Sequence, residues 1–369
     1  DGVCKMPLKF CPGPVAQPCF GTSQGTCQFF HTEKSDLVLT ECRQGNSSCT
    51  ATCVCESGYY GVDCSKDATT AESEEHTRIL LLSSFGTQQN NQDTSSSVVL
   101  AWENSLKGIT GNDPSVINPQ LAAGVISSLD GILTANNALQ VSPGNNILQC
   151  LDIAAQSDVV RRRRRLQRGL ASMDTGATER AEQLQQSLAS FGTATTNTMV
   201  PGQASRQEVQ TSFRLSSGVM EGGSEQTVAI PATSAEQADN RQSSAFLVPP
   251  SDTFTSITVT AVNAATYGLS DTLLTSPTSI NLGTNPCDGA PTTSCSLTVV
   301  LQNSVPVFTT APKPQYHNFT CRAQASINQS YFCDNGMWLN VSCPLMENED
   351  EAIIEGRCPE MIEEADCAT

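Results

Sequence analysis

The stretch CVCESGYYGVDC, residues 53–64, places Cys53 and Cys55 one residue apart and returns to Cys64 through the run Gly-Tyr-Tyr-Gly. A hydrophobic core does not require this pattern, whereas a small module crosslinked by disulfides does. A short segment with few aliphatic residues buries too little apolar surface to be stable without crosslinks. Glycine also permits the tight backbone turn before the last cysteine. The stretch therefore predicts a disulfide-rich module at the front of this 369-residue chain.

The 17 cysteines of the chain are unevenly distributed, because nine lie in the first 64 residues and five lie beyond residue 320. Cys150 stands alone, and Cys287 and Cys295 are predicted to close a hairpin or loop. A zinc site would require Cys-x2-Cys knuckles or Cys/His sets, which the sequence lacks. The cysteines therefore predict disulfides and hence a secreted protein. Because their number is odd, one thiol is expected to be free, bonded to another chain, or paired with a cysteine outside this sequence.

Four Asn-x-Ser/Thr sequons, at Asn46, Asn318, Asn328 and Asn340, predict N-glycosylation. We expect these glycans as covalent modifications, with no bound cofactor or metal ion. The net charge of −17 argues against nucleic acid as a partner. No apolar run approaches the roughly 18 residues of a membrane span, so no span is expected in this chain. The sequence starts at Asp1 without a signal peptide, which is typical of a mature protein or a fragment.

Changes in composition along the chain predict a multidomain α+β protein. Residues 1–66 form the first cysteine-rich region, and residues 67–200 show helical spacing and predict a helical subdomain. Residues 201–310 carry short segments rich in Thr, Ser and Val with turn signals between them, which predicts an antiparallel β-sandwich. Residues 311–369 form a small cysteine-rich, glycosylated module with an acidic tail.

Individual elements are predicted from periodicity and from start and stop signals. Helices are expected at Ile79–Phe85 after an acidic run, at Val98–Trp102, after the start signal Asn112-Asp113-Pro114, after a Pro-Gly break before Ile147, and from Leu166 to Leu188, either continuous or broken at Gly176. One face of the third helix is marked by Leu121, Val125, Leu129, Ile132 and Leu133. Strands are expected at 209–215, 227–231, 245–248, 255–262 and 297–301.

The last six cysteines of the first region have the order and spacing of an EGF-like module, residues 27–64, and the Gly-Tyr-Tyr-Gly run strengthens the resemblance. This resemblance implies the disulfides Cys27–Cys49, Cys42–Cys53 and Cys55–Cys64. The residues before Cys27 are Ser-Gln-Gly-Thr, without the acidic pair of calcium-binding EGF modules, so we expect no calcium here. Three further cysteines, at positions 4, 11 and 19, lie outside the module and cannot all pair among themselves.

An EGF-like module followed by helices and a Ser/Thr-rich sandwich resembles the stalks of polycystin-type and adhesion-type receptors, with their GAIN or REJ-like arrangement. The stretch MVPGQASRQEVQTSFRLSS, residues 199–217, looks most like it. A similar order occurs in surface glycoproteins of algae and protists, including flagellar-hair (mastigoneme) proteins. None of the three histidines begins the tripeptide at which such stalks often cleave themselves, so self-cleavage is not expected. Residues 333–344, CDNGMWLNVSCP, resemble the closing part of a sushi-like module.

The run RRRRRLQR contains five adjacent arginines, Arg161, Arg162, Arg163, Arg164 and Arg165. Adjacent like charges repel and surround every face of a helix, so an unpaired run is unfavourable. The favoured interpretation is contact with acidic groups, either of a sulfated glycan or of the acidic tail of a neighbouring subunit. The alternatives are cleavage by a proprotein convertase and a solvated helix start.

Three histidines without catalytic or metal-ligand spacing leave little for acid–base chemistry, and no phosphate-binding or hydrolase motif occurs. The sequence is therefore interpreted as a non-enzymatic protein, secreted and located at a cell or flagellar surface. The first hypothesis is a structural subunit that assembles with copies of itself into an extracellular filament or surface coat. The second is a ligand-binding ectodomain fragment of a polycystin-like or adhesion-type receptor, and an enzyme is the third.

Overall fold

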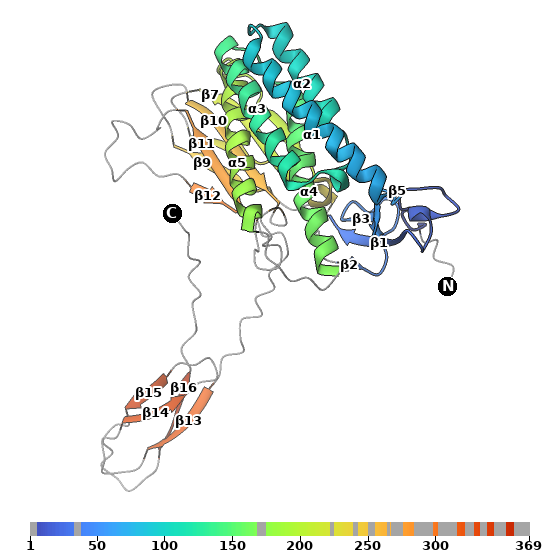
Figure 1. Ribbon diagram of the computed structural model, residues 1–369. Helices are drawn as coiled ribbons and strands as arrows, with labels where there is room; N and C mark the ends of the chain where they lie inside the picture. The colour runs from blue at the N-terminus through green and yellow to red at the C-terminus, as the bar shows by residue number, and fades with distance from the viewer. Residues whose placement is uncertain are drawn as a thin grey trace. The chain divides into compact units, whose positions relative to one another are not determined.

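The computed structural model forms two compact units, Asp1–Val305 and Pro306–Thr369 (Figure 1). The helices of the described residues all belong to the first unit. The described residues are 6–32, 38–167, 175–221, 225–238, 243–249, 255–263, 266, 276–283, 298–301, 316–321, 328–332, 338–342 and 352–357.

The first unit begins with a three-stranded antiparallel sheet in the order β2-β1-β3. β1 (Gly25–His31) pairs along its whole length with β3 (Cys49–Cys55), and β2 (Val38–Leu39) pairs with the end of β1. The 3-10 turn η1 (Pro18–Phe20) precedes the sheet. β4 (Tyr59–Tyr60) and β5 (Lys66–Asp67) form a small hairpin after it. Gly58 and Gly61 flank β4 with φ of 91° and 100°, the backbone conformation for which glycine is suited.

Four disulfides crosslink this region, namely Cys11–Cys27, Cys19–Cys53, Cys42–Cys49 and Cys55–Cys64. All six cysteines of the expected EGF-like module are therefore oxidised, and the expected Cys55–Cys64 bond is confirmed. The other two expected bonds, Cys27–Cys49 and Cys42–Cys53, are wrong. Cys4 lies outside the described residues, as do Cys287 and Cys295 with their expected hairpin.

The register of the sheet explains this correction. Cys27 lies opposite Cys53, whereas Cys49 lies opposite His31. Cys27 and His31 are four positions apart, which is about 13 Å along a strand. The two Cα atoms of a disulfide lie within about 7 Å of each other, so Cys27 cannot reach Cys49. Cys27 and Cys53 instead bond to cysteines of the segment that precedes β1.

Five long helices follow the module: α1 (Ala68–Asn91), α2 (Ser96–Thr110), α3 (Pro119–Leu139), α4 (Asn145–Gln167) and α5 (Thr175–Thr196). The first three start at capping side chains, because Asp67, Ser95 and Asn118 each accept the backbone N–H three residues further on. In the described part of the chain, no helix combines the length and the apolar character needed to cross a membrane.

The structure confirms the helical segments expected from the sequence, with two corrections. Asn112-Asp113-Pro114 starts only the 3-10 turn η2 (Pro114–Val116), and the cap that begins α3 is Asn118, followed by proline. The expected last helix is two elements, because Leu166 belongs to α4 whereas Leu184 and Leu188 belong to α5. The apolar face expected on α3 is confirmed, since all five of its residues are buried.

Two antiparallel sheets follow the helices, one in the order β11-β10-β7-β6 and the other in the order β12-β9-β8. The expected strands at 227–231, 245–248, 255–262 and 297–301 are confirmed, whereas residues 209–215 span the turn between two strands. One strand, β11, has no counterpart among the expected strands. The elements are β6 (Arg206–Val209), β7 (Phe213–Met220), β8 (Gln226–Ala229), α6 (Ser234–Ala238), β9 (Ala245–Val248), β10 (Thr255–Val262), β11 (Thr278–Leu282) and β12 (Thr298–Val300).

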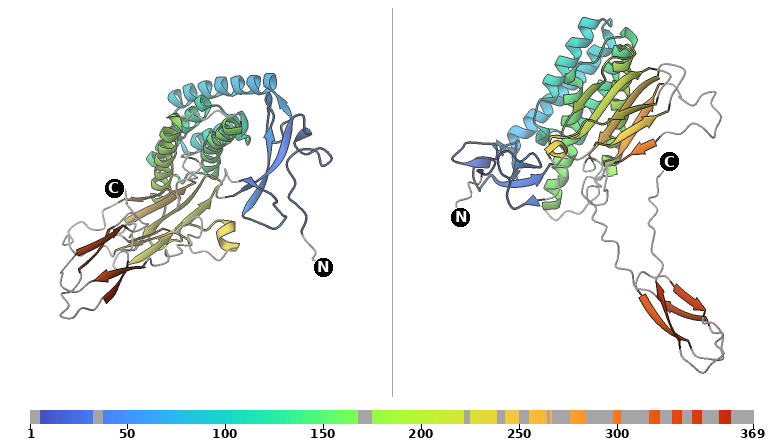
Figure 2. Two further views of the ribbon diagram at one scale, coloured as in Figure 1. Left: turned by 90° about the horizontal axis from the view of Figure 1, so that it is seen from below. Right: turned by 180° about the vertical axis from the view of Figure 1, so that it is seen from behind.

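The helices cover one face of the four-stranded sheet (Figure 2). Phe213, Leu215 and Val262 of this sheet belong to the same core cluster as the apolar faces of α2, α3, α4 and α5. Successive side chains of a strand point to opposite faces. Ile257 and Val259 of β10 accordingly join a second cluster, together with residues of β9. The four-stranded sheet is therefore packed on both faces, which leaves β10 buried along most of its length.

A glycine in α5 determines how closely the helices approach this sheet. A Cβ atom at Gly192 would lie 2.1 Å from Oγ1 and 2.6 Å from Cβ of Thr258 in β10. Thr258 is buried, and its Oγ1 donates a hydrogen bond to Oγ of Ser217 in β7 (3.2 Å). A stiff β-branched side chain in a packed interior has no free space into which it can move.

The second unit contains two pairs of antiparallel strands. β13 (Tyr316–Cys321) pairs with β16 (Ala352–Arg357), and β14 (Asn328–Phe332) pairs with β15 (Trp338–Ser342). The rings of His317 and Tyr331 stack with centroids 3.8 Å apart and so connect the two pairs. Of the sushi-like stretch, only residues 338–342 are described, so that resemblance stays a prediction.

Three of the four sequon asparagines are exposed to solvent. Asn318 and Asn340 are exposed on β13 and β15, and Asn46 is exposed in a loop of the first unit. Asn328 is the first residue of β14. Exposure is required for an attached glycan, and glycosylation at these four positions remains a prediction.

The tight contact at Gly192 predicts opposite effects of alanine at two helical glycines. Gly86 lies within α1 with no atom within 4 Å of an added Cβ, so Gly86→Ala should raise the free energy of unfolding by about 0.5–1 kcal/mol. Gly192→Ala should lower it by about 1–3 kcal/mol, because the added methyl group overpacks the interface with Thr258. Urea unfolding followed by circular dichroism measures both. Stabilisation by both substitutions would contradict the packing described for α5.

Candidate functional site

A cavity of about 410 Å³ lies where the disulfide module, the helices and the turns at one end of the four-stranded sheet meet. Its walls come from β3, from η2 and the residues before it, from the second half of α4, and from the turns around β7 and β10. The residues that the following paragraphs use are Pro12, Phe30, His31, Thr50–Cys55, Asp113, Ser115, Gln156, Val159, Val160 and Ser212.

The module wall of the cavity is attached to the helices by a polar network. Asp113 caps η2, because its Oδ1 accepts the N–H (2.9 Å) and the hydroxyl (2.6 Å) of Ser115. Oγ of Ser115 in turn accepts the backbone N–H of Gly61 next to β4 (3.0 Å). Nζ of Lys66 lies 2.7 Å from a carboxylate oxygen of Glu74 in α1 and 3.7 Å from one of Asp113. These contacts hold the module against the helices and neutralise the one carboxylate that lines the cavity.

The opposite wall is held by a buried carboxylate of α4. Oδ1 of Asp152 accepts the backbone N–H of Ser212, the residue just before β7 (2.7 Å), and Oδ2 accepts from Nε2 of Gln156 (2.7 Å). Burial in apolar surroundings raises the pKa of this carboxyl, and the bonds from Ser212 and Gln156 partly oppose the shift. Asp152 therefore fixes the position of the β6–β7 turn relative to α4.

The start of the arginine run is paired inside the chain. Arg161 donates to the backbone oxygen of Ile117 (2.8 Å) and forms an ion pair with Asp158, one turn earlier in α4. Asp158 is buried and also accepts from Nε and Nη2 of Arg180 in α5, at 2.9 Å each. Arg161 therefore has an acidic partner within its own chain. A contact of Arg161 with a polyanion or another subunit remains a prediction.

The remaining arginines of the run continue α4. Arg162 is half-buried and has a partner of its own, and Arg163, Arg164 and Arg165 lie within the helix, with side chains outside the described residues. The run lies in helical backbone through Gln167, and cleavage by a proprotein convertase remains a prediction. A contact of Arg163–Arg165 with another molecule remains a prediction.

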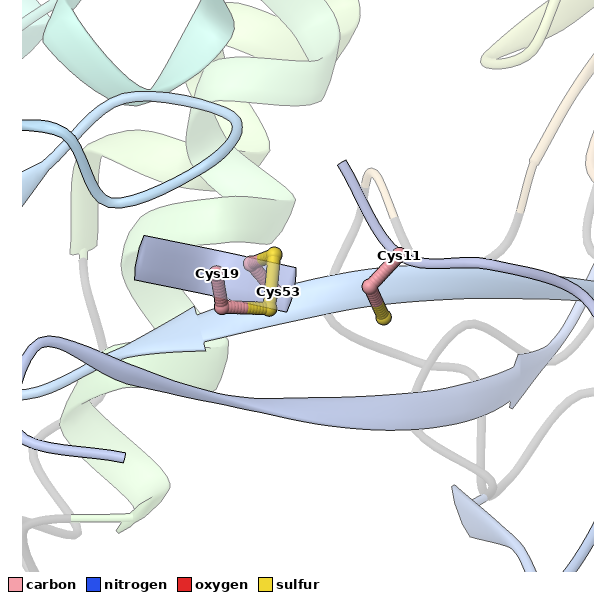
Figure 3. Close-up of side chains that lie close together, drawn as sticks. All are labelled: Cys11, Cys19 and Cys53. Carbon is pink, nitrogen blue, oxygen red and sulfur yellow. A yellow bond between two sulfur atoms is a disulfide. The ribbon is translucent and has the colours of Figure 1, made fainter. Parts of the chain in front are cut away.

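Three sulfur atoms of the module, from Cys11, Cys19 and Cys53, lie within 4.8 Å of one another (Figure 3). This is close enough to suggest a metal site by distance alone. Each sulfur is already bonded in a disulfide, Cys11 to Cys27 and Cys19 to Cys53. Metal coordination by cysteine requires a thiolate. The cluster is therefore part of the small apolar core of the module, which also contains Cys64.

Cys150 is the free cysteine of the described residues, and it is completely buried in α4 within the main helical core. Burial raises the pKa of its thiol, and a hydrogen bond with Thr110 partly opposes the shift. A buried, protonated thiol is a poor nucleophile and has no access to another chain. Of the three fates considered for an odd cysteine, Cys150 corresponds to a free thiol with a packing role.

The titratable residues described around the cavity do not form a catalytic arrangement. They are His31, at the end of β1, and Asp113, whose carboxylate is bound to Ser115 and lies close to Lys66. The rest of the lining consists of hydroxyl, amide and apolar groups, the last including Phe30 and the disulfide-bonded Cys53 and Cys55. Such walls suit the binding of an uncharged group by hydrogen bonds and apolar contact. Sequence reasoning did not identify this site, because its residues come from eight separate segments with no shared motif.

Comparisons with models of known protein families and with curated proteins find no match to this chain.

The disulfide pattern predicts the outcome of peptide mapping. Proteolysis of the unreduced protein, followed by mass spectrometry, should release peptides joined through Cys11–Cys27 and Cys19–Cys53, because the register of β1 and β3 separates Cys27 from Cys49. The same digest after reduction is the control. Peptides joined through Cys27–Cys49 and Cys42–Cys53 would contradict the structure and restore the EGF-like pairing.

The raised pKa of Asp152 predicts a pH-dependent stability. Below the usual aspartate pKa of about 3.9 the carboxyl is protonated in both the folded and the unfolded chain, and it stabilises the fold fully. As the pH rises through the raised folded-state pKa, the unfolded chain releases the proton more readily, so the free energy of unfolding falls. Asp152→Asn keeps the acceptor for Ser212 and cannot ionise, so its stability relative to wild type should increase over this range.

Urea unfolding between roughly pH 3 and 7 tests the Asp152 prediction. The exposed Asp93 provides the matched control, because Asp93→Asn removes a carboxylate without removing a buried group. Parallel curves for wild type and Asp152→Asn across the whole range would show that the folded state does not perturb this carboxyl.

Proposed function

We propose that this chain is a non-enzymatic structural subunit of an extracellular glycoprotein filament or surface coat, and that it assembles with copies of itself. In this proposal the N-terminal module is an EGF-like variant with its own disulfide pairing. The two sheets form the β-sandwich of a GAIN or REJ-like stalk, as in mastigoneme-type glycoproteins. The protein is secreted to a cell or flagellar surface and carries N-linked glycans.

The observation that carries the proposal is the way in which the buried carboxylates connect elements of the fold. Four carboxylates are buried in the described part of the chain, and each one joins separate elements. Glu103 of α2 accepts from Asn136 of α3 (3.0 Å) and from the N–H of Gly144 before α4 (3.1 Å). Glu236 of α6 accepts from Arg214 of β7 (2.5 Å). The other two, in α4, bind the turn before β7 and Arg180 of α5, as described above.

Burying a carboxylate is unfavourable unless it is paired or hydrogen-bonded, and removing the partner of a buried ion pair is strongly destabilising. An enzyme directs its functional titratable groups towards a substrate cleft. Here they connect one element to the next, which supports a mechanical role. Four disulfides among the described residues of the first unit and exposed sequon asparagines in both units support an oxidising, extracellular environment.

The alternative is a ligand-binding or adhesion ectodomain fragment of a polycystin-like or adhesion-type receptor. The cavity of about 410 Å³ favours it, because this volume is within the usual range of ligand pockets. The two proposals differ in association state. A receptor fragment stays monomeric at high concentration and binds an unrelated partner, whereas a structural subunit binds copies of itself.

Electron microscopy of the unreduced protein purified from its native source tests the proposal. We expect regular filaments or a lattice whose repeat equals the length of one subunit, and a fall in mass when N-linked glycans are removed enzymatically. The reduced protein is the control, because loss of the disulfides should unfold the module and abolish assembly. Single particles at high concentration would refute the structural proposal and favour the receptor alternative.

A further inference from the structure

The outer edge of β3 is the strongest unexplained feature beside the cavity. Among the strands that the structure describes, β3 pairs only with β1, so it is an edge strand of its sheet. Two hydrogen bonds at the ends of the β1–β3 ladder show which of its residue pairs are hydrogen-bonded. The N–H of Thr32 donates to the oxygen of Ser48 (2.9 Å), and the N–H of Glu56 donates to the oxygen of Gln24 (2.8 Å). These two pairs are therefore the hydrogen-bonded kind, and such pairs alternate along an antiparallel ladder.

This alternation determines which backbone groups of β3 point towards β1 and which point away from it. Thr50, Thr52 and Val54 exchange hydrogen bonds with β1, whereas the N–H and C=O groups of Ala51 and Cys53 point away from it. Among the described residues, no backbone or side-chain group bonds to these outward groups. The edge therefore presents hydrogen-bonding groups at strand spacing, and their natural complement is another extended chain.

The cavity runs along this edge. It is lined by every residue from Thr50 to Cys55, which includes side chains on both faces of the strand. Apolar atoms of Pro12, Phe30, Val159 and Val160 contribute to the walls. β3 also lacks the charged residue or proline with which edge strands are commonly protected.

The edge strand β6, in contrast to β3, carries charged residues, because Arg206 and Glu208 form an ion pair 3.1 Å apart. Such charges discourage a further strand from pairing with the edge. β3 has no equivalent, and the cavity leaves room beside it.

A second edge strand of the same chain has complementary properties. Within the described part of the chain β12 pairs only with β9, and all three of its residues are exposed. Val299 and Val300 are 43% and 47% exposed, and the next residue, Leu301, is 48% exposed. Because neighbouring side chains point to opposite faces, both faces of this strand are apolar and uncovered. Such a pattern is typical of a strand that is buried on both sides.

We propose that β12 of a second copy of this chain enters the cavity and adds to the free edge of β3. The backbone of the incoming strand bonds to the outward groups of Ala51 and Cys53, and its valines contact the apolar walls. The two surfaces lie on different parts of the molecule, so the contact is heterologous and propagates head to tail into an open assembly. This inference rests on the proposed function, because it specifies the contact through which the subunits assemble.

Binding of a peptide tests the proposed contact between β12 and β3 and does not require the whole chain to assemble. The probe is a fluorescent peptide that carries Thr298–Leu301 between Gly-Ser flanks, and fluorescence anisotropy measures its binding to the whole protein. Ala51→Pro removes one outward N–H and leaves the ladder with β1 intact, because proline is accepted at an outward position of an edge strand. We expect it to weaken binding about fivefold or more. Ala51→Ser retains the N–H and is the matched control.

Val160→Trp provides a second variant, in case proline disturbs the module. Val160 is half-buried on α4, and a larger side chain there occupies the cavity from the opposite wall. We expect the same loss of binding, with the four disulfides of the module unchanged by mass spectrometry. A peptide in which proline replaces both valines should not bind. Absence of binding to the wild type, or equal binding to Ala51→Pro, Val160→Trp and wild type, would overturn the inference.

Experiments on the full chain distinguish a failure of this inference from a failure of the proposed function. Val299→Lys places a charge on the exposed face of β12 and should abolish assembly in electron micrographs, while the variant still binds the wild-type peptide. Filaments of Val299→Lys that equal those of the wild type would overturn the role of β12 and leave the structural function standing. If the wild type binds the peptide but forms no filaments, strand addition at β3 is supported and the proposed structural function fails.

Discussion

The close approach of α5 to β10 is the constraint on which the first unit depends. At Gly192 the helix has no side chain, and Thr258 of β10 occupies the space that a Cβ atom would need. This contact allows Phe191 and Leu188, the neighbouring buried residues of α5, to reach the core that they share with Phe213 of the sheet. A larger residue at the contact would separate helix and sheet and leave voids, which a close-packed interior does not tolerate.

Packing on both faces of the four-stranded sheet has a consequence for its polar residues. β10 alternates between threonines and aliphatic residues, and both sets are buried. The threonines bond to neighbours within the sheet, as Thr260 does with Ser279 of β11 (2.6 Å). A buried hydroxyl that is hydrogen-bonded avoids most of the cost of losing water. The sheet can therefore contact the helices through small polar residues, which permits the short distance at Gly192.

The module and the cavity follow from a second set of constraints. Because Cys27 and Cys53 face each other across β1 and β3, each bonds to the preceding segment, and that segment packs on one face of the sheet. The outer side of β3 has no strand partner among the described residues. The bonds from Gly61 to Ser115 and from Ser212 to Asp152 then place η2 and the turn before β7 at fixed positions around it. The cavity is the space that these attachments leave beside an unpaired edge.

The sequence by itself determined the disulfide-rich front, the apolar faces of the helices and the positions of β9 and β10, because cysteine density, helical periodicity and alternation are local properties of the chain. It also indicated that Arg161 requires an acidic partner. Only the tertiary structure decided which cysteines pair, that Asp158 and Arg180 complete the arginine contact, and that Asp152 holds the turn at Ser212. Each of these depends on strand register or on contacts between residues that are distant in sequence, and no local pattern encodes which partner will be within reach.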